Sequence, residues 1–327
     1  MDFCELLCIS LGAVVSIYFG VKLVLFSWIL FPTVWFPLPK LFFTSMGEWA
    51  VVTGASEGIG KAYAFALAER GMNVVIISRT KANLDKVAKE IGDTTGRKAK
   101  VVVADFTKDD VFDQIEDELK EMNIGVLVNN VGVIVNAVPC RFLETSNLDQ
   151  SINQLINCNV KALVKMCKII LPGMVNRGTG AIINISSGVA SSCVPLYTLY
   201  AASKVFVHRF SQALQAEYKE KGIIIQAVAP FSVSTRMTFY QAPGTLVLTP
   251  DEFVNTSLQY LLSGDNTYGS ISHSLVGWLL QRIPDWILFS ECMQNNLQNY
   301  IKEALSERQP PNKNNAIRRP VYHCMKD

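Results

Sequence analysis

A tyrosine and a lysine stand four residues apart in the stretch "PLYTLYAASKVF", at Tyr200 and Lys204. The stretch has the composition of a packed helix, and residues at positions i and i+4 of a helix project from the same face. A phenol titrates at about pH 10, and a fixed cation beside it favours the phenolate and lowers that pKa. The pair is therefore a candidate acid with its activator, although most Tyr and Lys pairs at this spacing lie on exposed helix surface.

A serine upstream of this pair favours a catalytic role for it. Ser187 ends "GAIINISS", residues 180–187, an apolar segment that is predicted to be a buried strand. In doubly wound sheets, ligands bind beyond the carboxyl ends of the strands. A hydroxyl at that edge, thirteen residues before Tyr200, favours a catalytic site over a helix surface.

Three glycines in "VVTGASEGIGKA" suggest a phosphate-binding turn. Gly54, Gly58 and Gly60 lie between a predicted strand and a predicted helix. Glycines let the backbone approach a pyrophosphate, and the following helix N-terminus offers free amides and the positive end of its dipole. The alternative is a plain turn, but the position at the first strand-to-helix connection favours a dinucleotide cofactor.

The end of the second predicted strand, "IISRT", indicates which dinucleotide. No carboxylate lies from Val74 to Thr80. An acidic residue there would bind the ribose 2′-hydroxyl of NAD, whereas Arg79 can accommodate the 2′-phosphate of NADP. NADP(H) is therefore favoured, the alternative being that Arg79 is an ordinary solvated charge. Asp105, after the third predicted strand, is placed either to meet the adenine or to cap its own loop.

These residues need a scaffold of alternating strands and helices. Apolar strands that alternate with amphipathic helices indicate a parallel sheet that is covered on both sides. We predict an α/β fold, a Rossmann-type doubly wound parallel sheet with helices on both faces, in a catalytic domain of residues 41–306. The expected strands are residues 48–54, 73–78, 99–106, 124–130, 180–187 and 223–230, and helices are expected at 60–71 and from 81 to about 91.

The first 40 residues are predicted to be a membrane anchor with a proline-containing linker. Lys22 is the only charge from Leu6 to Leu38. Asp2 and Glu5 stand where a cleaved signal peptide would carry basic residues, so we expect the anchor to be retained. The alternative is a buried N-terminal helix. Lys22 and Lys40 follow the acidic residues, so the positive-inside rule places the catalytic domain in the cytosol.

The remaining features exclude some classes of function. A net charge of +2 without a basic stripe argues against nucleic-acid binding. The eight cysteines include no C-x-x-C pair and the three histidines are scattered, so no metal site is predicted. The segment Ser272–Phe289 is apolar but interrupted by charges and a proline, and is expected to form a lid, a membrane-resting surface or an ordinary core helix. The tail, residues 307–327, is rich in Pro, Asn and Arg and is predicted to be disordered.

Together the motifs resemble those of the short-chain dehydrogenase/reductase family. The resemblance covers residues 47–269 and rests on "TGASEGIG", "NNVG", "INCNV", "ISSG", "YAASK" and "PFSVST" in the family's order. It implies a catalytic triad of Ser187, Tyr200 and Lys204, which Asn159 completes to a tetrad through a water. The cofactor-binding residues that it implies are Gly54, Ser56, Gly58, Ile59, Arg79, Asp105, Asn130, Tyr200, Lys204 and Val233.

Two positions depart from the usual family pattern. Val131 stands where most members have alanine, and Phe231 follows Pro230 where most have glycine. Membrane-bound 17β-hydroxysteroid dehydrogenases share both departures, and they resemble this chain also in the hydrophobic N-terminus, "TTGR" and "ADFTKDD". That resemblance implies an enzyme of the endoplasmic reticulum membrane that uses NADPH to reduce the 17-keto group of steroids, such as androstenedione to testosterone. Ser187 would bind the substrate carbonyl and Tyr200 would donate the proton.

Other functions remain open at this point. A very-long-chain 3-ketoacyl-CoA reductase of fatty-acid elongation resembles the chain over nearly the same length and has the same tetrad. A catalytically inactive, cofactor-binding scaffold is an alternative of another class, although such a protein would be free to lose Tyr200 or Lys204. A homodimer is among the assemblies that the resemblance allows.

Overall fold

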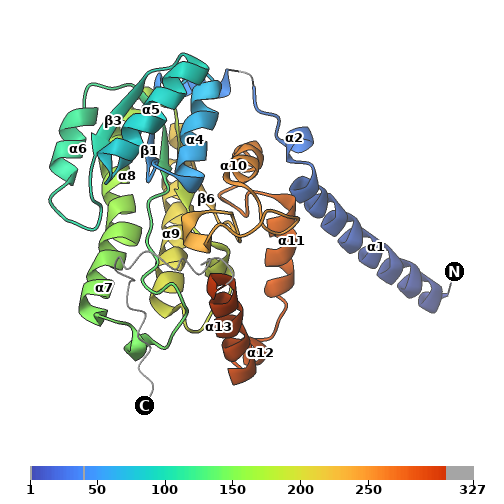
Figure 1. Cartoon of the computed structure of the whole chain (residues 1–327). Coiled ribbons are helices and arrows are strands. Elements are labelled where there is room, and N and C mark those ends of the chain that lie inside the picture. The colour runs from blue at the N-terminus through green and yellow to red at the C-terminus, as the bar shows by residue number, and fades with distance from the viewer. Residues whose placement is uncertain (1, 40, 307–327) are drawn as a thin grey trace.

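A parallel sheet of seven strands lies at the centre of the computed structural model, which describes residues 2–39 and 41–306 (Figure 1). The strand order is β3-β2-β1-β4-β5-β6-β7, so the predicted doubly wound sheet is confirmed. The chain order reverses between β1 and β4, the place where such sheets bind ligands. The strands are β1 (Trp49–Thr53), β2 (Asn73–Ser78), β3 (Ala99–Val103), β4 (Ile124–Asn129), β5 (Gly180–Ile185), β6 (Ile223–Val228) and β7 (Asn266–Thr267).

Several strands end earlier than the sequence predicted. β3, β5 and β6 stop two or three residues short of the expected ends at residues 106, 187 and 230. The residues left outside the ladder include Asp105 and Ser187, whose polar side chains lie at the carboxyl edge. β7 was not predicted, because two residues give no periodic pattern.

Helices cover both faces of the sheet and bury one apolar cluster on each. One face packs against α4 (Gly58–Glu69), α5 (Lys81–Thr95) and α10 (Pro250–Gln259). The other packs against α6 (Phe112–Leu119), α8 (Ala162–Arg177) and α9 (Thr198–Tyr218). β4 and β5 lie between the two clusters and are buried at every residue, which explains why their sequences are continuously apolar.

A distorted helix connects the middle of the chain to α8. α7 (Leu148–Leu155) continues into a π-helical segment, Ile156–Lys161, which runs directly into α8. Asn159 lies within that segment. π-helical segments frequently occur at functional sites, and the sequence pattern gave no sign of this one.

The N-terminus forms one exposed helix that extends away from the domain (Figure 1). α1 (Phe3–Leu30) has 28 residues, which at about 1.5 Å each exceed the roughly 30 Å of membrane hydrocarbon. None of its most apolar window is buried, so the alternative of a buried N-terminal helix is wrong. α1 is a candidate membrane anchor. The linker contains α2 (Pro32–Trp35), and α3 (Phe42–Met46) follows it.

Three further helices complete the described chain. The interrupted apolar segment forms α11 (Ile271–Leu280) and α12 (Asp285–Leu288), and α13 (Glu291–Ser306) follows. α11 contacts α1. The predicted disordered tail lies outside the described residues, and the domain bounds at residues 40 and 306 stay predictions.

Candidate active site

A cavity of about 870 Å³ opens at the carboxyl edge of the sheet. Its walls come from the glycine turn, the ends of β2 to β6, the start of α9, the loop after β6, and α13. It brings together the residues that the sequence suggested for the site, except Gly60 and Asn159. Those residues are Gly54, Ser56, Gly58, Ile59, Arg79, Asp105, Asn130, Ser187, Tyr200, Lys204 and Val233.

The glycine turn between β1 and α4 is held tightly against β4. A Cβ atom at Gly60 would lie only 2.4 Å from the carbonyl oxygen of Gly54, so no larger residue fits there without moving the turn. The Asn130 carboxamide donates hydrogen bonds to the carbonyl oxygens of Thr53 and Gly54 at 3.0 and 3.3 Å. These contacts fix the turn and direct the N-terminus of α4 toward the cavity, which suits an anionic ligand.

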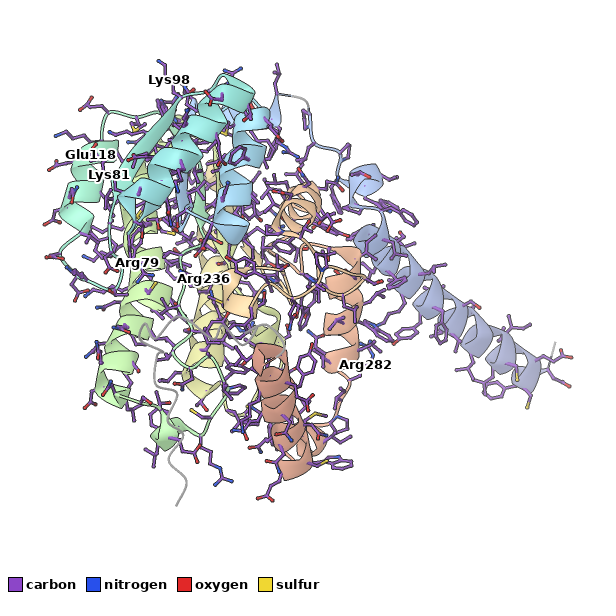
Figure 2. The ribbon with its side chains drawn as sticks, in the orientation of Figure 1. Arg79, Lys81, Lys98, Glu118, Arg236 and Arg282 are labelled. Atoms are coloured by element: carbon purple, nitrogen blue, oxygen red, sulfur yellow. The ribbon has the colours of Figure 1, made fainter. Side chains whose placement is uncertain are left out.

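The end of β2 offers a cation and two hydroxyls. Ser56 Oγ and Ser78 Oγ lie 3.0 Å apart, and Arg79 is exposed on the cavity wall (Figure 2). Among the salt bridges of the described residues, none involves Arg79. Its guanidinium is therefore available to an anion. Ser78 was not predicted as a site residue, although it directly precedes Arg79.

Asp105 has the loop-capping role that the sequence allowed. Its Oδ1 accepts hydrogen bonds from the backbone N–H and the hydroxyl of Thr107, at 3.1 and 2.8 Å. The same residue lines the cavity, so the capping role does not remove it from the nucleotide site.

An ion pair joins two parts of the cavity wall. Arg236, in the loop after β6, lies 2.7 Å from the Glu57 carboxylate in the glycine turn. The residues beside this ion pair, Gly58 and Thr235, are also close, because a Cβ atom at Gly58 would lie 3.1 Å from Thr235 Cγ2. No local sequence pattern predicts this contact, which depends on how the two loops pack.

Tyr200 and Lys204 lie on the same face of α9, as the sequence predicted. Lys204 Nζ is 5.8 Å from the centroid of the Tyr200 ring and donates a hydrogen bond to the Ile185 carbonyl oxygen at 3.0 Å. Lys204 is only 4% exposed, so the pair is not helix surface. Burial lowers the pKa of Lys204 to about 8, because a low-dielectric environment disfavours its charged form.

The expected effect of Lys204 on the Tyr200 phenol is wrong for this structure. Burial raises the pKa of Tyr200, and a hydrogen bond with Ser187 only partly opposes that shift. Desolvation is the largest cause of the raised pKa, and the Lys204 ammonium donates its hydrogen bond to a backbone carbonyl. The phenol is consequently protonated at neutral pH, which is the form that a proton donor requires.

Asn159 lies behind the cavity wall. Its carboxamide oxygen accepts a hydrogen bond from the Val133 N–H at 2.7 Å, and its NH₂ group donates to the Val133 carbonyl at 3.0 Å and to Ser203 Oγ at 3.1 Å. The side chain thereby ties the segment after β4 to α9. The water-mediated link to the other catalytic residues stays a prediction.

Phe231 connects the loop after β6 to the loop that carries Ser187. A Cβ atom at Gly188 would lie 2.3 Å from the Phe231 ring, so the ring lies directly on that glycine. The ring also stacks on Tyr268 with 5.5 Å between centroids, and the Gly188 N–H donates to the Pro230 carbonyl at 2.7 Å. The departure from glycine at position 231 therefore adds packing contacts behind Ser187.

Part of the cavity lining is mainly apolar and was largely missed by the sequence analysis. Tyr197 is one turn from Tyr200, but the contribution of α13 depends on tertiary packing that no local pattern reveals. The residues of this apolar part are Val189, Tyr197, Met237, Phe239, Leu297, Tyr300 and Ile301.

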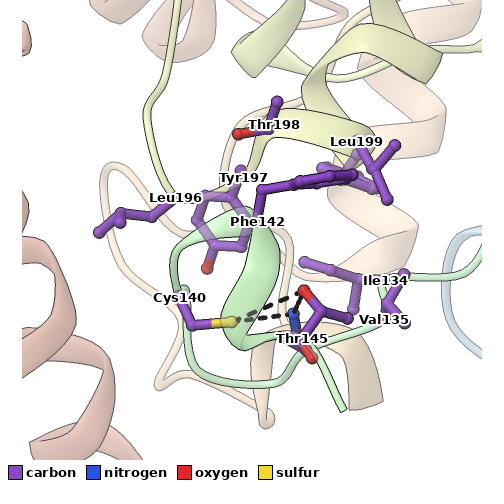
Figure 3. A pocket seen from close by; sticks show the side chains of 11 residues that line it. Ile134, Val135, Cys140, Phe142, Thr145, Leu196, Tyr197, Thr198 and Leu199 are labelled. Carbon is purple, nitrogen blue, oxygen red and sulfur yellow. Dashed lines mark hydrogen bonds between the residues drawn. The ribbon is translucent and has the colours of Figure 1, made fainter. Parts of the chain in front are cut away.

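A second, much smaller pocket adjoins the same tyrosines (Figure 3). Its volume of about 30 Å³ suits roughly one water molecule rather than a substrate. Asn136 Nδ2 donates hydrogen bonds to Cys140 Sγ at 3.1 Å and Thr145 Oγ1 at 2.9 Å at its edge. The large cavity is therefore the candidate active site.

Comparisons with known proteins agree with this geometry. The model of the short chain dehydrogenase family matches residues 48–244. The chain is 53% identical over 302 residues to 17-beta-hydroxysteroid dehydrogenase type 3 of Danio rerio, covering 92% of this chain and 98% of that protein. It is 43% identical over 267 residues to very-long-chain 3-oxoacyl-CoA reductase of Anas platyrhynchos, covering 80% and 85%. A solved short-chain dehydrogenase from Sphingobium yanoikuyae in complex with NADPH is 28% identical with a TM-score of 0.58, covering 82% of this chain and 98% of that chain.

Proposed function

The chain belongs to the short-chain dehydrogenase family, and we propose that it reduces the 17-keto group of steroids such as androstenedione, forming testosterone with NADPH as cofactor. The observation that carries this proposal is the position of Ser187 and Tyr200 on the wall of a large cavity that also has many apolar lining residues. A 17-ketosteroid is a rigid, lipophilic molecule whose 17-keto oxygen, at one end, is the reacting oxygen. It suits an apolar chamber with hydroxyl donors at one wall.

The residues of the cavity fit a nicotinamide dinucleotide phosphate. The glycine turn and the N-terminus of α4 would hold the pyrophosphate, since Gly60 leaves no room for a side chain. Arg79 would bind the 2′-phosphate, with the Ser56 and Ser78 hydroxyls beside it. Val233 and Lys204, which line the same cavity, would contact the nicotinamide part of the cofactor.

The proposed chemistry depends on the protonation states of the side chains that line the cavity. The Ser187 hydroxyl and the Tyr200 phenol would bind and polarise the substrate carbonyl, and the cofactor, when bound, supplies the hydride. Tyr200, protonated at neutral pH, would give its proton to the developing alkoxide, a general-acid contribution of about 10² to 10⁴ in rate. Lys204 would bind the nicotinamide ribose, and Asn159 would hold a water that returns a proton to the tyrosine.

The charges of the cavity favour a steroid over an acyl-CoA. Its lining cations are Arg79, Lys204 and Arg236, and each already has a role: the proposed 2′-phosphate, the ribose, and the ion pair with Glu57. The phosphates of coenzyme A would need further cations. Among the described residues, no other lysine or arginine lines the cavity.

A direct assay tests the proposal. Membranes that contain the protein are incubated with NADPH and either androstenedione or a long-chain 3-ketoacyl-CoA. We expect testosterone to form. Turnover of the acyl-CoA alone would assign the chain to fatty-acid elongation, and turnover of neither ketone would favour the inactive scaffold.

We further propose that α1 anchors the protein in the endoplasmic reticulum membrane with the catalytic domain in the cytosol. Support comes from the length and exposure of α1 and from the order of acidic and basic residues around it. A homodimer stays a prediction.

A further inference from the structure

An exposed apolar surface lies on the two helices that follow β7. α11 is a short apolar helix, yet several of its large side chains face away from the protein. Together with Trp286 of α12 and Phe289, which directly follows α12, they form what we term the α11–α12 face: Leu275, Trp278, Leu279, Trp286 and Phe289, exposed by 41, 45, 57, 74 and 44%. Scattered exposed apolar residues are ordinary, but a group of five large side chains within fifteen residues marks an interaction site.

The α11–α12 face continues the apolar surface of the anchor. α1 contacts α11, and the most apolar window of α1 is wholly exposed. Figure 1 shows α11 and α12 on the side of the domain from which α1 extends. A membrane that accommodates α1 therefore lies next to α11.

The polar residues at the face suit a lipid headgroup layer. The Arg282 guanidinium lies 3.6 Å from the centroid of the Trp278 ring and is exposed at the end of α11 (Figure 2). Tryptophan prefers the membrane interface, where its ring is apolar and its N–H remains hydrated. An arginine beside it can reach headgroup phosphates while its stem stays in apolar surroundings.

We propose that the α11–α12 face rests in the headgroup layer of the same membrane that α1 enters. The inference rests on the proposed anchoring by α1, and it gives the domain a second contact that fixes its orientation. α13 packs against α12 and contributes Leu297, Tyr300 and Ile301 to the cavity wall. The apolar part of the cavity thus lies on the membrane side, where a lipophilic ketone is concentrated.

Quenching of tryptophan fluorescence by brominated lipid tests this contact in the full chain. The chain has five tryptophans. Replacing Trp28 and Trp35 of the anchor by phenylalanine leaves Trp49, Trp278 and Trp286. Vesicles of phosphatidylcholine with brominated acyl chains should then quench much of the emission relative to unbrominated vesicles, because two of the three emitters would lie at the bilayer.

The matched control adds Trp278→Phe and Trp286→Phe, which leaves only Trp49 at the start of β1 and should abolish the quenching. Equal emission in the two kinds of vesicle before this change would overturn the inference. Carbonate extraction of the same samples distinguishes anchoring by α1 from membrane contact by the α11–α12 face. Protein that stays in the pellet without quenching would be anchored by α1 but would lack the second contact. Absent quenching together with a doubled mass in detergent would assign the face to a second copy of the chain.

Discussion

Desolvation moves the pKa values of the Tyr200 phenol and the Lys204 ammonium in opposite directions. The phenol keeps its proton more firmly, while the ammonium loses its proton more easily than in solution. Both changes disfavour charge. Near neutral pH the pair therefore consists of a neutral donor and a cation, which is the combination that ketone reduction needs.

Tyr200→Phe tests the proton donor. The substitution removes the acidic hydrogen and keeps the packing of the ring, so turnover should fall by at least about 10² while NADPH still binds. Tyr197→Phe is the matched control, because Tyr197 is a second cavity phenol whose ring lies 6.3 Å from that of Tyr200. A Tyr200→Phe protein with near wild-type turnover would return the pair to an ordinary structural role.

The pKa of Lys204 predicts a pH dependence of cofactor binding. The ammonium is the form that donates hydrogen bonds to a ribose, and it is lost as the pH rises through about 8. The dissociation constant of NADPH, followed by fluorescence from pH 7 to 9, should therefore increase above about pH 8. Lys204→Met should bind more weakly and without this dependence. Parallel pH profiles of the two proteins would contradict the assignment.

Arg79→Asp tests the choice of cofactor. If the guanidinium binds the 2′-phosphate, the variant should show a sharply higher KM for NADPH and a smaller difference between NADPH and NADH. Lys81→Asp makes the same change of charge two residues away, at an exposed lysine paired with Asp85, and should leave the selectivity unchanged. Equal effects of the two substitutions would mean that Arg79 acts only as a general surface charge and does not bind the 2′-phosphate specifically.

At the scale of elements, local sequence patterns predicted the strands and helices whose formation depends on their own residues. The apolar runs predicted six strands and the parallel sheet, and the parallel sheet placed Ser187 near the glycine turn. Patterns of this kind carry no information on segments that are defined by their neighbours. The π-helical segment around Asn159, the approach of α13 to the cavity, and the Glu57–Arg236 ion pair all depend on packing between distant elements.

The loop after β6 illustrates this limit and yields a prediction. Position 231 was recognised as a departure from the family pattern, but its consequence required the structure, in which the Phe231 ring lies on Gly188. Phe231→Gly should leave a void there and lower the free energy of unfolding by roughly 2–3 kcal/mol, less than for a fully buried ring. It should also lower kcat more than it weakens NADPH binding, because Ser187 would lose its support.

Phe231→Tyr is the matched control, since it keeps the ring and its stack on Tyr268. It should restore most of the stability and of kcat. If Phe231→Gly loses stability in thermal unfolding but keeps the wild-type kcat, the ring supports the fold alone and does not position the serine.

At the scale of the whole molecule, we propose that α1 is retained and anchors the α/β domain. Alkaline carbonate should then leave the protein in the membrane pellet, because the bilayer would hold α1 by its apolar length rather than by surface charge. Protease added to intact microsomes should digest the domain, as expected for a cytosolic orientation. Protection of the domain until detergent is added would reverse the proposed orientation.

The Glu57–Arg236 contact bears on the order of events in a catalytic cycle. It joins the turn that would hold the pyrophosphate to the loop after β6, so we expect opening of this ion pair to accompany the release of a dinucleotide from the turn. Both side chains are partly exposed, and such pairs contribute at most about 1 kcal/mol, a factor of roughly five in an opening equilibrium. We therefore expect NADPH release to quicken modestly with rising ionic strength, which stopped-flow fluorescence would detect. The Glu57–Arg236 ion pair would slow the exchange of NADP for NADPH without preventing it.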